Sequence, residues 1–441
     1  MKRWYQMLLV GGCVLVCRTA LGAEPWTLER ALEQALAHSP DARLARNRIL
    51  ASQAELAQAN AAFWPRLQFQ SSYIRTDNPM MVFGSILNQR AYSSSLDFND
   101  VPDVDDLNAR GLVTVPLYTG GRNKAGRAAA TAHTEASKRD NEAVRNALGF
   151  EVARAFFTVL KAREFVRAAE SAVISYQTNL GIANKRLSNG TLLRTDVLDL
   201  QVRLAQARED LARARNARAL ALRAMRNLLG IEEEPFEVAD YGPTLVVPSS
   251  ADFSRRPELA AARQRERAAE EQLRGSQSGR LPRVNAFGSL DFDYGTKFDH
   301  GAGSYTAGAL IQWDIWDGHL TRAKVREAQA NLDSAREEQR KLRLALDLEV
   351  EQSQLDLQTA NERLTVTEQA VSQAQESVSL NRARFEQGMA LSTQLMDAET
   401  ALVGARVRRA EAEADQRIAI AALRKALALP QLDSQLGTES K

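Results

Sequence analysis

The sequence has few of the residues on which enzymatic or metal chemistry usually depends. Among 441 residues it has two cysteines, four histidines and no glycine-rich phosphate loop. Cys13 and Cys17 both lie close to the N-terminus, which leaves the remaining chain without a disulfide framework or thiol chemistry. No histidines are paired in a metal-binding spacing. We therefore expect neither an enzyme nor a protein with a cofactor or a bound metal.

The sequence also lacks a strong net charge and a long apolar run. Its formal net charge is +2, which gives no drive towards nucleic acid. Beyond the N-terminus, no segment reaches about 18 uninterrupted apolar residues, so no transmembrane helix is expected. Aromatic residues make up only 6%, whereas alanine, leucine, arginine, glutamate and glutamine dominate long stretches. This composition favours long helices or coiled coils.

Residues 1–23 have the pattern of a secretory signal peptide that is removed. Lys2 and Arg3 precede an apolar core at Met7–Val16, which is followed by small residues suited to cleavage. A lipid-anchored cysteine is the alternative, but neither "VGGC" nor "VLVC" fits that pattern well. An exported chain without a transmembrane helix is periplasmic, secreted, or a β-barrel of the outer membrane.

The chain contains an internal repeat. Two proline pairs and two glycine pairs occupy equivalent positions in the two halves. The proline pairs share one offset in residue number, and the glycine pairs share a shorter offset. The first half therefore has the longer connection between its two strands. The pairs are Pro40 and Pro257, Pro65 and Pro282, Gly120 and Gly318, and Gly190 and Gly388.

Each half has the pattern of a helix, two strands, a very long helix, a turn and a further helix. The predicted first helices lie at about 27–62 and 256–279, and the long helices at about 123–187 and 321–386. The predicted boundaries are a first repeat at 24–231, an irregular equatorial linker at 232–255, a second repeat at 256–430 and a tail at 431–441.

The helices after the turns carry heptad seams, which predict packing against the preceding long helices. Apolar residues are spaced alternately by four and three, with Arg218 and Arg409 as polar interruptions. The seam residues are Leu193, Val197, Leu200, Leu204, Ala207, Leu211, Ala214, Ala221, Met225 and Leu228 in the first half, and Leu391, Leu395, Ala398, Leu402 and Ala405 in the second.

Four strands are predicted, at about 66–74, 109–118, 283–294 and 304–316. Each alternates apolar and polar residues over about 10 residues, as in a transmembrane barrel with a wet lumen. A soluble sheet with one buried face gives the same alternation. Export and the long helices favour the barrel. Four strands cannot close a barrel, so a transmembrane sheet of this kind requires several subunits. A barrel with a water-filled channel needs at least three subunits.

These features together resemble the TolC-like outer-membrane efflux protein family. The resemblance covers essentially the whole mature chain and rests on the repeat, on "VPLYTGGR" and "WDIWDGH", and on "GTLLRTDVLDLQVRLAQA" with "GMALSTQLMDAETALVGA". It implies a mainly α chain with a small β part, whose homotrimer forms a 12-stranded barrel in outer-membrane lipid, joined to a periplasmic α-helical cylinder. It also implies an exit duct that works with a periplasmic adaptor protein and an inner-membrane transporter.

The resemblance also implies three sets of site residues. The periplasmic constriction would be formed by Asp397 and Gln394 of the second repeat with Asp196 and Asp199 of the first. The tips that dock on the adaptor would be Gly190, Thr191 and Leu192 with Gly388, Met389 and Ala390. The crossings between strand and helix would be Pro65, Gly120, Gly121, Pro282 and Gly318.

One departure from the family concerns the closed state. In some members an acidic residue at the Asp196 position is tied to an arginine and a tyrosine, but the corresponding residues here are Ala390 and Phe385. Arg194 and Arg382 are nearby candidates for the missing partner. Helix capping is a plainer explanation for Asp196 and Asp199, because both follow a glycine turn at the start of a helix.

The main functional alternative is a periplasmic coiled-coil adaptor of an efflux system. Such a protein would normally carry one helical hairpin and compact β-domains. The duplication of the hairpin, with a two-stranded unit before each copy, argues against an adaptor.

Overall fold

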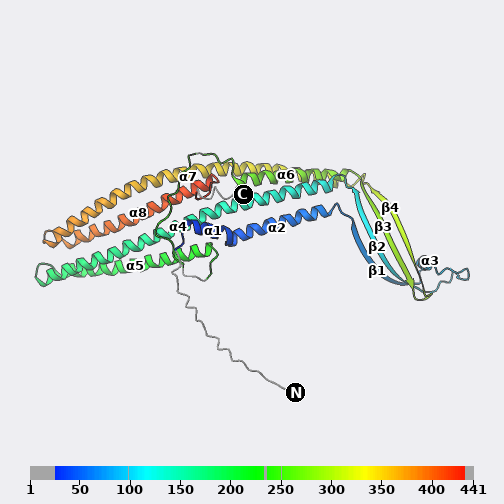
Figure 1. Cartoon of the computed structure of the whole chain (residues 1–441), viewed down its shortest axis with the longest axis horizontal. Helices are drawn as coiled ribbons and strands as arrows, with labels where there is room; N and C mark the ends of the chain where they lie inside the picture. Colours follow the sequence, from blue (N-terminus) through cyan, green and yellow to red (C-terminus); the bar gives the residue numbers. More distant parts are fainter. Residues whose placement is uncertain (1–24, 98, 233–235, 250, 433–441) are drawn as a thin grey trace, which may run out of the picture.

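The computed structural model describes residues 25–97, 99–232, 236–249 and 251–432. The predicted signal peptide at 1–23 lies outside these residues, as does most of the predicted tail at 431–441. The molecule is long, with a β-sheet at one end and the tips of two helical hairpins at the other (Figure 1). No helix in the described part of the chain is long and apolar enough to cross a membrane.

The two helical hairpins have the same dimensions. α4 (Arg122–Ser188) and α7 (Leu320–Glu386) each contain 67 residues, and α5 (Arg194–Leu228) and α8 (Ser392–Ala426) each contain 35. At 1.5 Å per residue, each long helix measures about 100 Å. The starts of α4 and α7 are separated by the same offset as Gly120 and Gly318, so the helices follow the sequence repeat.

The four strands form one antiparallel sheet in the order β1-β2-β3-β4. The strands are β1 (Arg66–Thr76), β2 (Val104–Tyr118), β3 (Arg283–Gly295) and β4 (His300–Gln312). β2 pairs with β3, so the sheet joins the two halves of the chain. Among the described residues, β1 and β4 each have a strand partner on one side only.

The last strand ends earlier than the sequence predicts. The prediction placed it at about 304–316, whereas β4 begins at His300 and ends at Gln312. Gln312 is paired with Arg283, which is the first residue of β3. Because β3 starts there, directly after Pro282, the residues beyond Gln312 have no neighbouring strand to pair with.

The first predicted helix is two helices. α1 (Leu28–His38) ends before Ser39, and α2 (Pro40–Ala61) begins at a proline. Proline has no backbone N–H and its ring clashes with the preceding turn, so it stops one helix and suits the first position of the next. The Ser39 hydroxyl accepts a hydrogen bond from the backbone N–H of Asp41, at 3.3 Å, and caps α2.

The predicted connection between the first two strands contains a helix that the sequence analysis missed. α3 (Pro79–Asn88) begins after Asn78, whose side chain accepts hydrogen bonds from the backbone N–H groups of Met80 and Met81. The counterpart of α2 in the second half is α6 (Pro257–Gln277), followed by the short 3-10 helix η1 (Ser278–Arg280).

The main hydrophobic core lies at mid-length of the long helices, where α1 and the irregular segment at 236–249 wrap around them (Figure 1). Phe156 and Phe157 of α4 are fully buried there with Met225 of α5. Val238 of the irregular segment packs into the same core and pairs with Trp26 by an isolated parallel bridge. The irregular segment therefore helps to hold the two hairpins together.

Both crossings from strand to helix use left-handed backbone. Gly120 and Gly121 have φ of 63° and 88°, and at the equivalent positions Gly318 and His319 have φ of 64° and 68°. Asp317 accepts a hydrogen bond from the Thr321 backbone N–H, at 2.7 Å, which caps the start of α7. Hydrogen bonds from the hydroxyl and the backbone N–H of Thr321 keep the pKa of the Asp317 carboxyl below its usual value.

We predict that Gly120→Ala destabilises the protein more than Gly318→Ala. Both substitutions place a side chain on left-handed backbone, at about 1–2 kcal/mol. A Cβ at Gly120 would also lie 2.9 Å from the Leu281 Cβ and the Ser278 carbonyl oxygen, whereas nothing lies within 4 Å of one at Gly318. Thermal unfolding of the two variants measures the difference. Equal decreases in the unfolding temperature of the two variants would contradict the role given to the contact with Leu281.

Candidate functional site

The two hairpin turns lie together at the end of the molecule opposite the sheet (Figure 1). Their backbones are alike. Gly190 and Gly388 have φ of 73° and 79°, and each follows the last turn of a long helix. The Thr191 N–H bonds to the Arg186 carbonyl at 2.9 Å, and the Met389 N–H bonds to the Arg384 carbonyl at 2.8 Å. A side chain at either glycine would be strained, which explains the repeated "G" in the two motifs.

The tip residues predicted for adaptor docking divide into exposed and packed groups. Met389 is exposed, as are its neighbours Leu391 and, in the other turn, Leu193. Leu192 and Ala390 instead pack against a cluster formed by both hairpins. The structure therefore leaves an exposed apolar surface at the tips, while part of the predicted set holds the hairpins together.

The predicted constriction residues of α8 lie in its first two turns. Gln394 is exposed, and its side chain accepts a hydrogen bond from the Leu391 N–H at 3.3 Å, which caps the helix. Asp397 is one turn further along and exposed. Within the described part of the chain its side chain makes neither a hydrogen bond nor an ion pair.

The two predicted carboxylates of α5 have different surroundings. Asp196 accepts a hydrogen bond from the Ser392 hydroxyl of α8, at 2.6 Å, and Ser392 is buried. Asp199 is exposed and has no such partner among the described residues. Asp196 therefore links the two hairpins, although through a serine.

Neither arginine considered as a substitute partner for Asp196 takes that role. Arg194 makes no hydrogen bond or ion pair within the described residues. Arg382 instead donates to Glu399 at 2.5 Å. A third arginine, Arg186 of α4, donates to the Phe385 carbonyl at 2.7 Å and lies over the Phe385 ring, with its Cζ 4.9 Å from the ring centre. At this point the arginine that joins the two hairpins is therefore Arg186 of α4 rather than Arg194 or Arg382.

Glu399 is the main residue that the sequence analysis missed. Its side chain is 2% exposed, and besides Arg382 its partner is Asn179 of α4, at 3.3 Å. One residue further on, Thr400 lies 3.0 Å from the Tyr176 hydroxyl of α4. A glutamate between the seam residues Ala398 and Leu402 was the available sequence signal. Four contacts thus join the hairpins, and we call them the inter-hairpin contacts: Asn179–Glu399, Tyr176–Thr400, Arg186–Phe385 and Asp196–Ser392.

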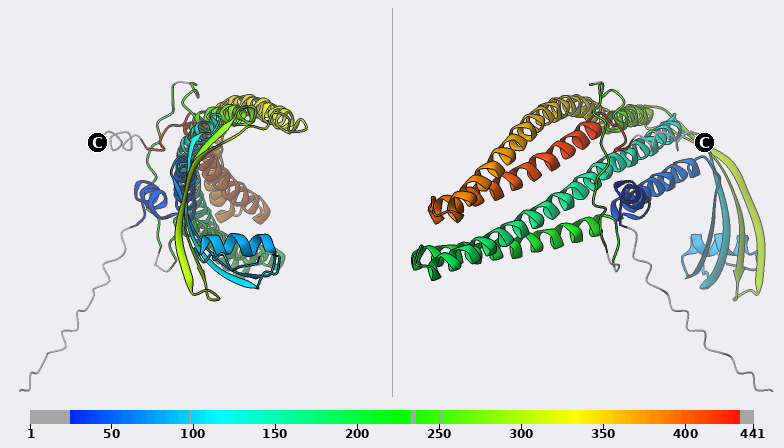
Figure 2. Two further views of the ribbon diagram at one scale, coloured as in Figure 1. Left: turned by 90° about the vertical axis from the view of Figure 1, so that its right-hand side faces the viewer. Right: turned by 60° about the vertical axis from the view of Figure 1, so that its left-hand side comes forward.

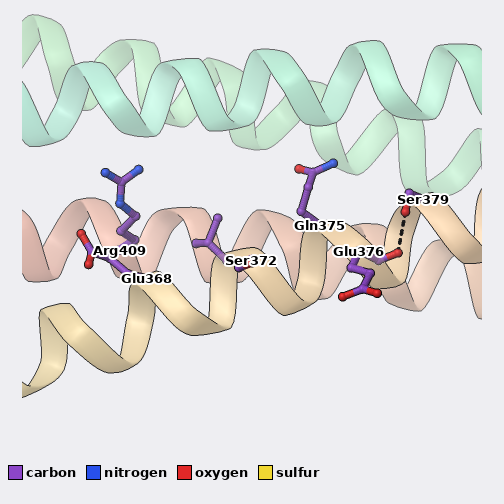
Figure 3. A pocket seen from close by; sticks show the side chains of 7 residues that line it. Glu368, Ser372, Gln375, Glu376, Ser379 and Arg409 are labelled. Atoms are coloured by element: carbon purple, nitrogen blue, oxygen red, sulfur yellow. Dashed lines mark hydrogen bonds between the residues drawn. The ribbon is translucent and has the colours of Figure 1, made fainter.

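A shallow groove of about 660 Å³ runs along the second hairpin beside these contacts. Figure 3 shows that its side chains come from α7 and from Arg409, the polar interruption of the α8 seam. Apart from Val371 its lining residues are polar or charged, although most of the surface that they present to the groove is that of their apolar atoms. No group of three or more potential metal ligands occurs in the described part of the chain.

The sheet has one polar and one apolar face. Asn108 donates to Asp293 across β2 and β3 at 2.9 Å, and Arg110 pairs with Asp291 on the same face. The opposite face is apolar and exposed. Its large side chains include Leu67, Phe69, Tyr73, Leu107, Leu290, Phe292, Tyr305 and Ile311.

Exposed tryptophans mark the end of the sheet next to the helices. Trp64 precedes β1, and Trp313 and Trp316 follow β4. Tryptophan is enriched where a membrane meets water, because its ring is apolar and its N–H is polar. An apolar face bordered by such residues is suited to lipid, and the polar face to a water-filled lumen.

Comparisons with known proteins agree with this geometry. The family model "Outer membrane efflux protein" matches residues 31–231 and 250–429. The pyoverdine export outer membrane protein OpmQ of Pseudomonas aeruginosa is 24% identical over 387 residues, 86% of this chain and 80% of its own length. The outer membrane protein TolC of Vibrio cholerae is 24% identical over 318 residues, 67% of this chain and 72% of its own.

Solved structures share the fold. The outer membrane protein VceC of Vibrio cholerae has a TM-score of 0.76 at 21% identity, covering 92% of this chain and 97% of its own. The outer-membrane channel OprN has a TM-score of 0.78 at 21% identity, covering 91% and 89%. The TolC-like resemblance is confirmed, and the adaptor alternative is not favoured. The chain belongs to the outer membrane efflux protein family and is an exit duct in the outer membrane of a Gram-negative bacterium.

Proposed function

We propose that three copies of the chain form one continuous duct, which opens to the exterior through a 12-stranded barrel and to the periplasm between the hairpin tips. The observation that carries the proposal is the open sheet, in which no other described strand pairs with the outer edge of β1 or of β4. Unpaired strand edges are not tolerated in lipid, so each edge requires a strand from another copy. Three four-stranded sheets give a barrel wide enough for a wet lumen, whereas two give a filled one.

The entrance is assigned to the tips and to the first turns of α8. Asp397 is exposed there and has no hydrogen-bonding or ion-pair partner among residues that the structure describes, and in a trimer its three copies would form a negative ring. A ring of carboxylates favours cations. Gln394, Asp196 and Asp199 lie in the corresponding turns, with Asp196 assigned to holding the hairpins together.

The tips are also assigned to a periplasmic adaptor protein, which in turn joins an inner-membrane transporter. The exposed side chains Leu193, Met389 and Leu391 give the tips an apolar surface that a partner would cover. Relatives are named for export of pyoverdine and for secretion of alkaline protease. Because their cargoes differ so much in size, we assign the choice of cargo to the transporter rather than to this chain.

We predict that purified trimer forms cation-selective pores in planar bilayers and that Asp397→Ala raises their conductance and weakens their cation selectivity. Removal of the carboxylate abolishes the negative ring and widens the entrance. Asp356→Ala is the matched control, because Asp356 is also an exposed carboxylate but lies in α7 about 45 Å from the hairpin tips. A monomeric or pore-free folded protein would refute the duct. Equal behaviour of the two variants would refute only the role of Asp397.

A further inference from the structure

Two carboxylates lie side by side on the polar face of the sheet, near the end farthest from the hairpins (Figure 1). Residues alternate along β2, so Asp106 shares this face with Asn108, and Asn108 is paired with Asp293 of β3. The carboxyl groups of Asp106 and Asp293 are within hydrogen-bonding reach of each other. Asp293 is 3% exposed and Asp106 is half-buried. Two negative charges this close repel each other strongly when water is excluded, so the pair needs a shared proton or a cation.

The side chains that donate to this pair are neutral. Asn108 donates to Asp293 at 2.9 Å, and Gln89 donates to Asp106 at 3.0 Å. The next carboxylate along the same face of β3 is by contrast paired with an arginine of β2. Among the residues that the structure describes, neither Asp106 nor Asp293 has an ion pair with an arginine or a lysine. The charge of the two carboxylates is therefore not compensated by the described part of the chain.

Gln89 has a buried oxygen atom that lacks a partner. The residue follows α3, which contacts β2, β3 and β4 at this end of the sheet (Figure 2). Its side chain is fully buried, and its amide nitrogen donates to the Asp105 carbonyl at 2.8 Å as well as to Asp106. Its amide oxygen is buried without a hydrogen-bond partner among the described residues. Such atoms are rare in folded proteins, and a bound water or ion is a common reason for them.

Gly295 leaves the room in which the Gln89 amide lies beside the carboxylates. A Cβ at Gly295 would overlap the Gln89 amide oxygen. A half-turn of the amide about its last carbon–carbon bond exchanges its nitrogen and oxygen, and would aim the oxygen at the Asp105 carbonyl and the Asp106 carboxylate. Three oxygen atoms would then converge, with the Asp293 carboxylate beside them. Oxygen atoms without a hydrogen between them repel one another, so this arrangement is stable only around a cation.

We infer that the carboxylates of Asp106 and Asp293, the amide oxygen of Gln89 and the carbonyl oxygen of Asp105 bind a Ca²⁺ ion. Ca²⁺ takes carboxylate, amide and carbonyl oxygens in flexible geometry and completes its shell with water, whereas Mg²⁺ demands a near-ideal octahedron. With only two carboxylates, the dissociation constant is expected on the order of 0.1–1 mM. The expectation of no bound metal considered histidine and cysteine, which this site does not use. All four ligands come from one chain, so the inference does not rest on the proposed trimer.

Calorimetric titration of Ca²⁺ into the folded, chelator-treated protein in detergent tests the site. The unchanged protein should bind one Ca²⁺ per chain at neutral pH. Asp106→Asn and Asp293→Asn should each raise the dissociation constant at least tenfold, because each removes a charged ligand and keeps the shape of the side chain. Asp299→Asn is the matched control and should bind as the unchanged protein does. Asp299 is an exposed carboxylate in the turn between β3 and β4, where it accepts a hydrogen bond from the Tyr294 hydroxyl at 2.7 Å.

Gln89→Glu distinguishes a ligand from a purely structural side chain. A third carboxylate should lower the Ca²⁺ dissociation constant about tenfold, because the number of charged ligands sets the affinity of such sites. It should also lower the unfolding temperature in chelator and restore it in Ca²⁺. A variant that binds Ca²⁺ no more tightly than the unchanged protein would refute the role of Gln89.

Three other results would overturn the calcium site. Absence of Ca²⁺ binding by the unchanged protein would show that Asp106 and Asp293 share a proton instead. Equal binding by Asp293→Asn, Asp299→Asn and the unchanged protein would place the ion elsewhere on the molecule. Mg²⁺ bound as tightly as Ca²⁺ would refute the choice of metal. Failure of the protein to form a trimer would remove the duct but would leave the calcium site standing.

Discussion

Replacing Arg382 of α7 by alanine is expected to destabilise the second hairpin where Glu399 of α8 meets α4 of the first, and so to make the periplasmic entrance leaky. Arg382 donates to Glu399 at 2.5 Å, and Glu399 is 2% exposed. Without Arg382, the carboxylate stays buried with Asn179 as its remaining partner, which at 3.3 Å is a weak one. Leaving a buried charge unpaired is strongly destabilising, and because Arg382 itself is partly exposed we expect a loss on the order of 3 kcal/mol.

The measurement for Arg382→Ala is thermal unfolding together with pore conductance in planar bilayers. Arg340→Ala is the control, because Arg340 and its partner Glu337 are both exposed and 3.6 Å apart, and such pairs contribute about 0–1 kcal/mol. Arg382→Met with Glu399→Leu should restore much of the stability, since apolar replacement of both partners removes the unpaired charge. An Arg382→Ala protein as stable and as closed as Arg340→Ala would contradict the role of Glu399.

The long helices and the strands could be predicted from the sequence because their signals are local and repeated. Heptad spacing and strand alternation extend over many residues, and the constant offset of the repeat located equivalent turns in both halves. The starts of β1 and β3 followed from the prolines before them, since proline ends the helix there. The start of each of these strands depends on the backbone conformation, which the preceding proline restricts locally.

The features that the sequence did not reveal depend on contacts between distant segments. Ser392 and Asp196 lie in different halves of the chain, and nothing near either residue identifies the other. Glu399 is buried by the packing of α4 against α8, and that packing depends on residues more than 200 positions away. α3 was hidden in a connection rich in polar residues, although Asn78 and Pro79 are a normal helix start. The family pattern misled in one respect, because it directed attention to Arg194 and Arg382 as partners of Asp196.

Arg256→Ala is expected to cause the other large loss, about 3–5 kcal/mol, because it breaks a buried ion pair. The Arg256 side chain is 3% exposed, and its partners are Glu258 at 2.8 Å and Glu349 at 3.1 Å. It also donates to the Ala426 carbonyl at 3.0 Å, at the end of α8. One side chain at the start of α6 thus joins that helix to α7 and to the C-terminus of α8, where a cation is favoured by the helix dipole.

The neighbouring Arg255 provides a control, because it is exposed and its replacement by alanine should change stability by no more than about 0.5 kcal/mol. Arg256→Lys should recover only part of the loss, since an ammonium group cannot reproduce the forked hydrogen bonding of a guanidinium. Unfolding of the detergent-solubilised protein in denaturant measures all three variants. Similar midpoints for Arg255→Ala and Arg256→Ala would show that the buried pair contributes nothing.

The same cluster explains why the effect should depend on pH. Burial disfavours the charged form of Glu349, but the hydrogen bond from Lys425 and the charge of Arg256 outweigh it and lower the pKa of the Glu349 carboxyl. A lowered pKa in the folded state stabilises the fold above the unfolded value of about 4.3, and this contribution is lost as the pH falls through the lowered value. The difference in free energy of unfolding between the unchanged protein and Arg256→Ala should therefore be largest at neutral pH. It should become smaller in acid, because a protonated Glu349 no longer needs a cation beside it.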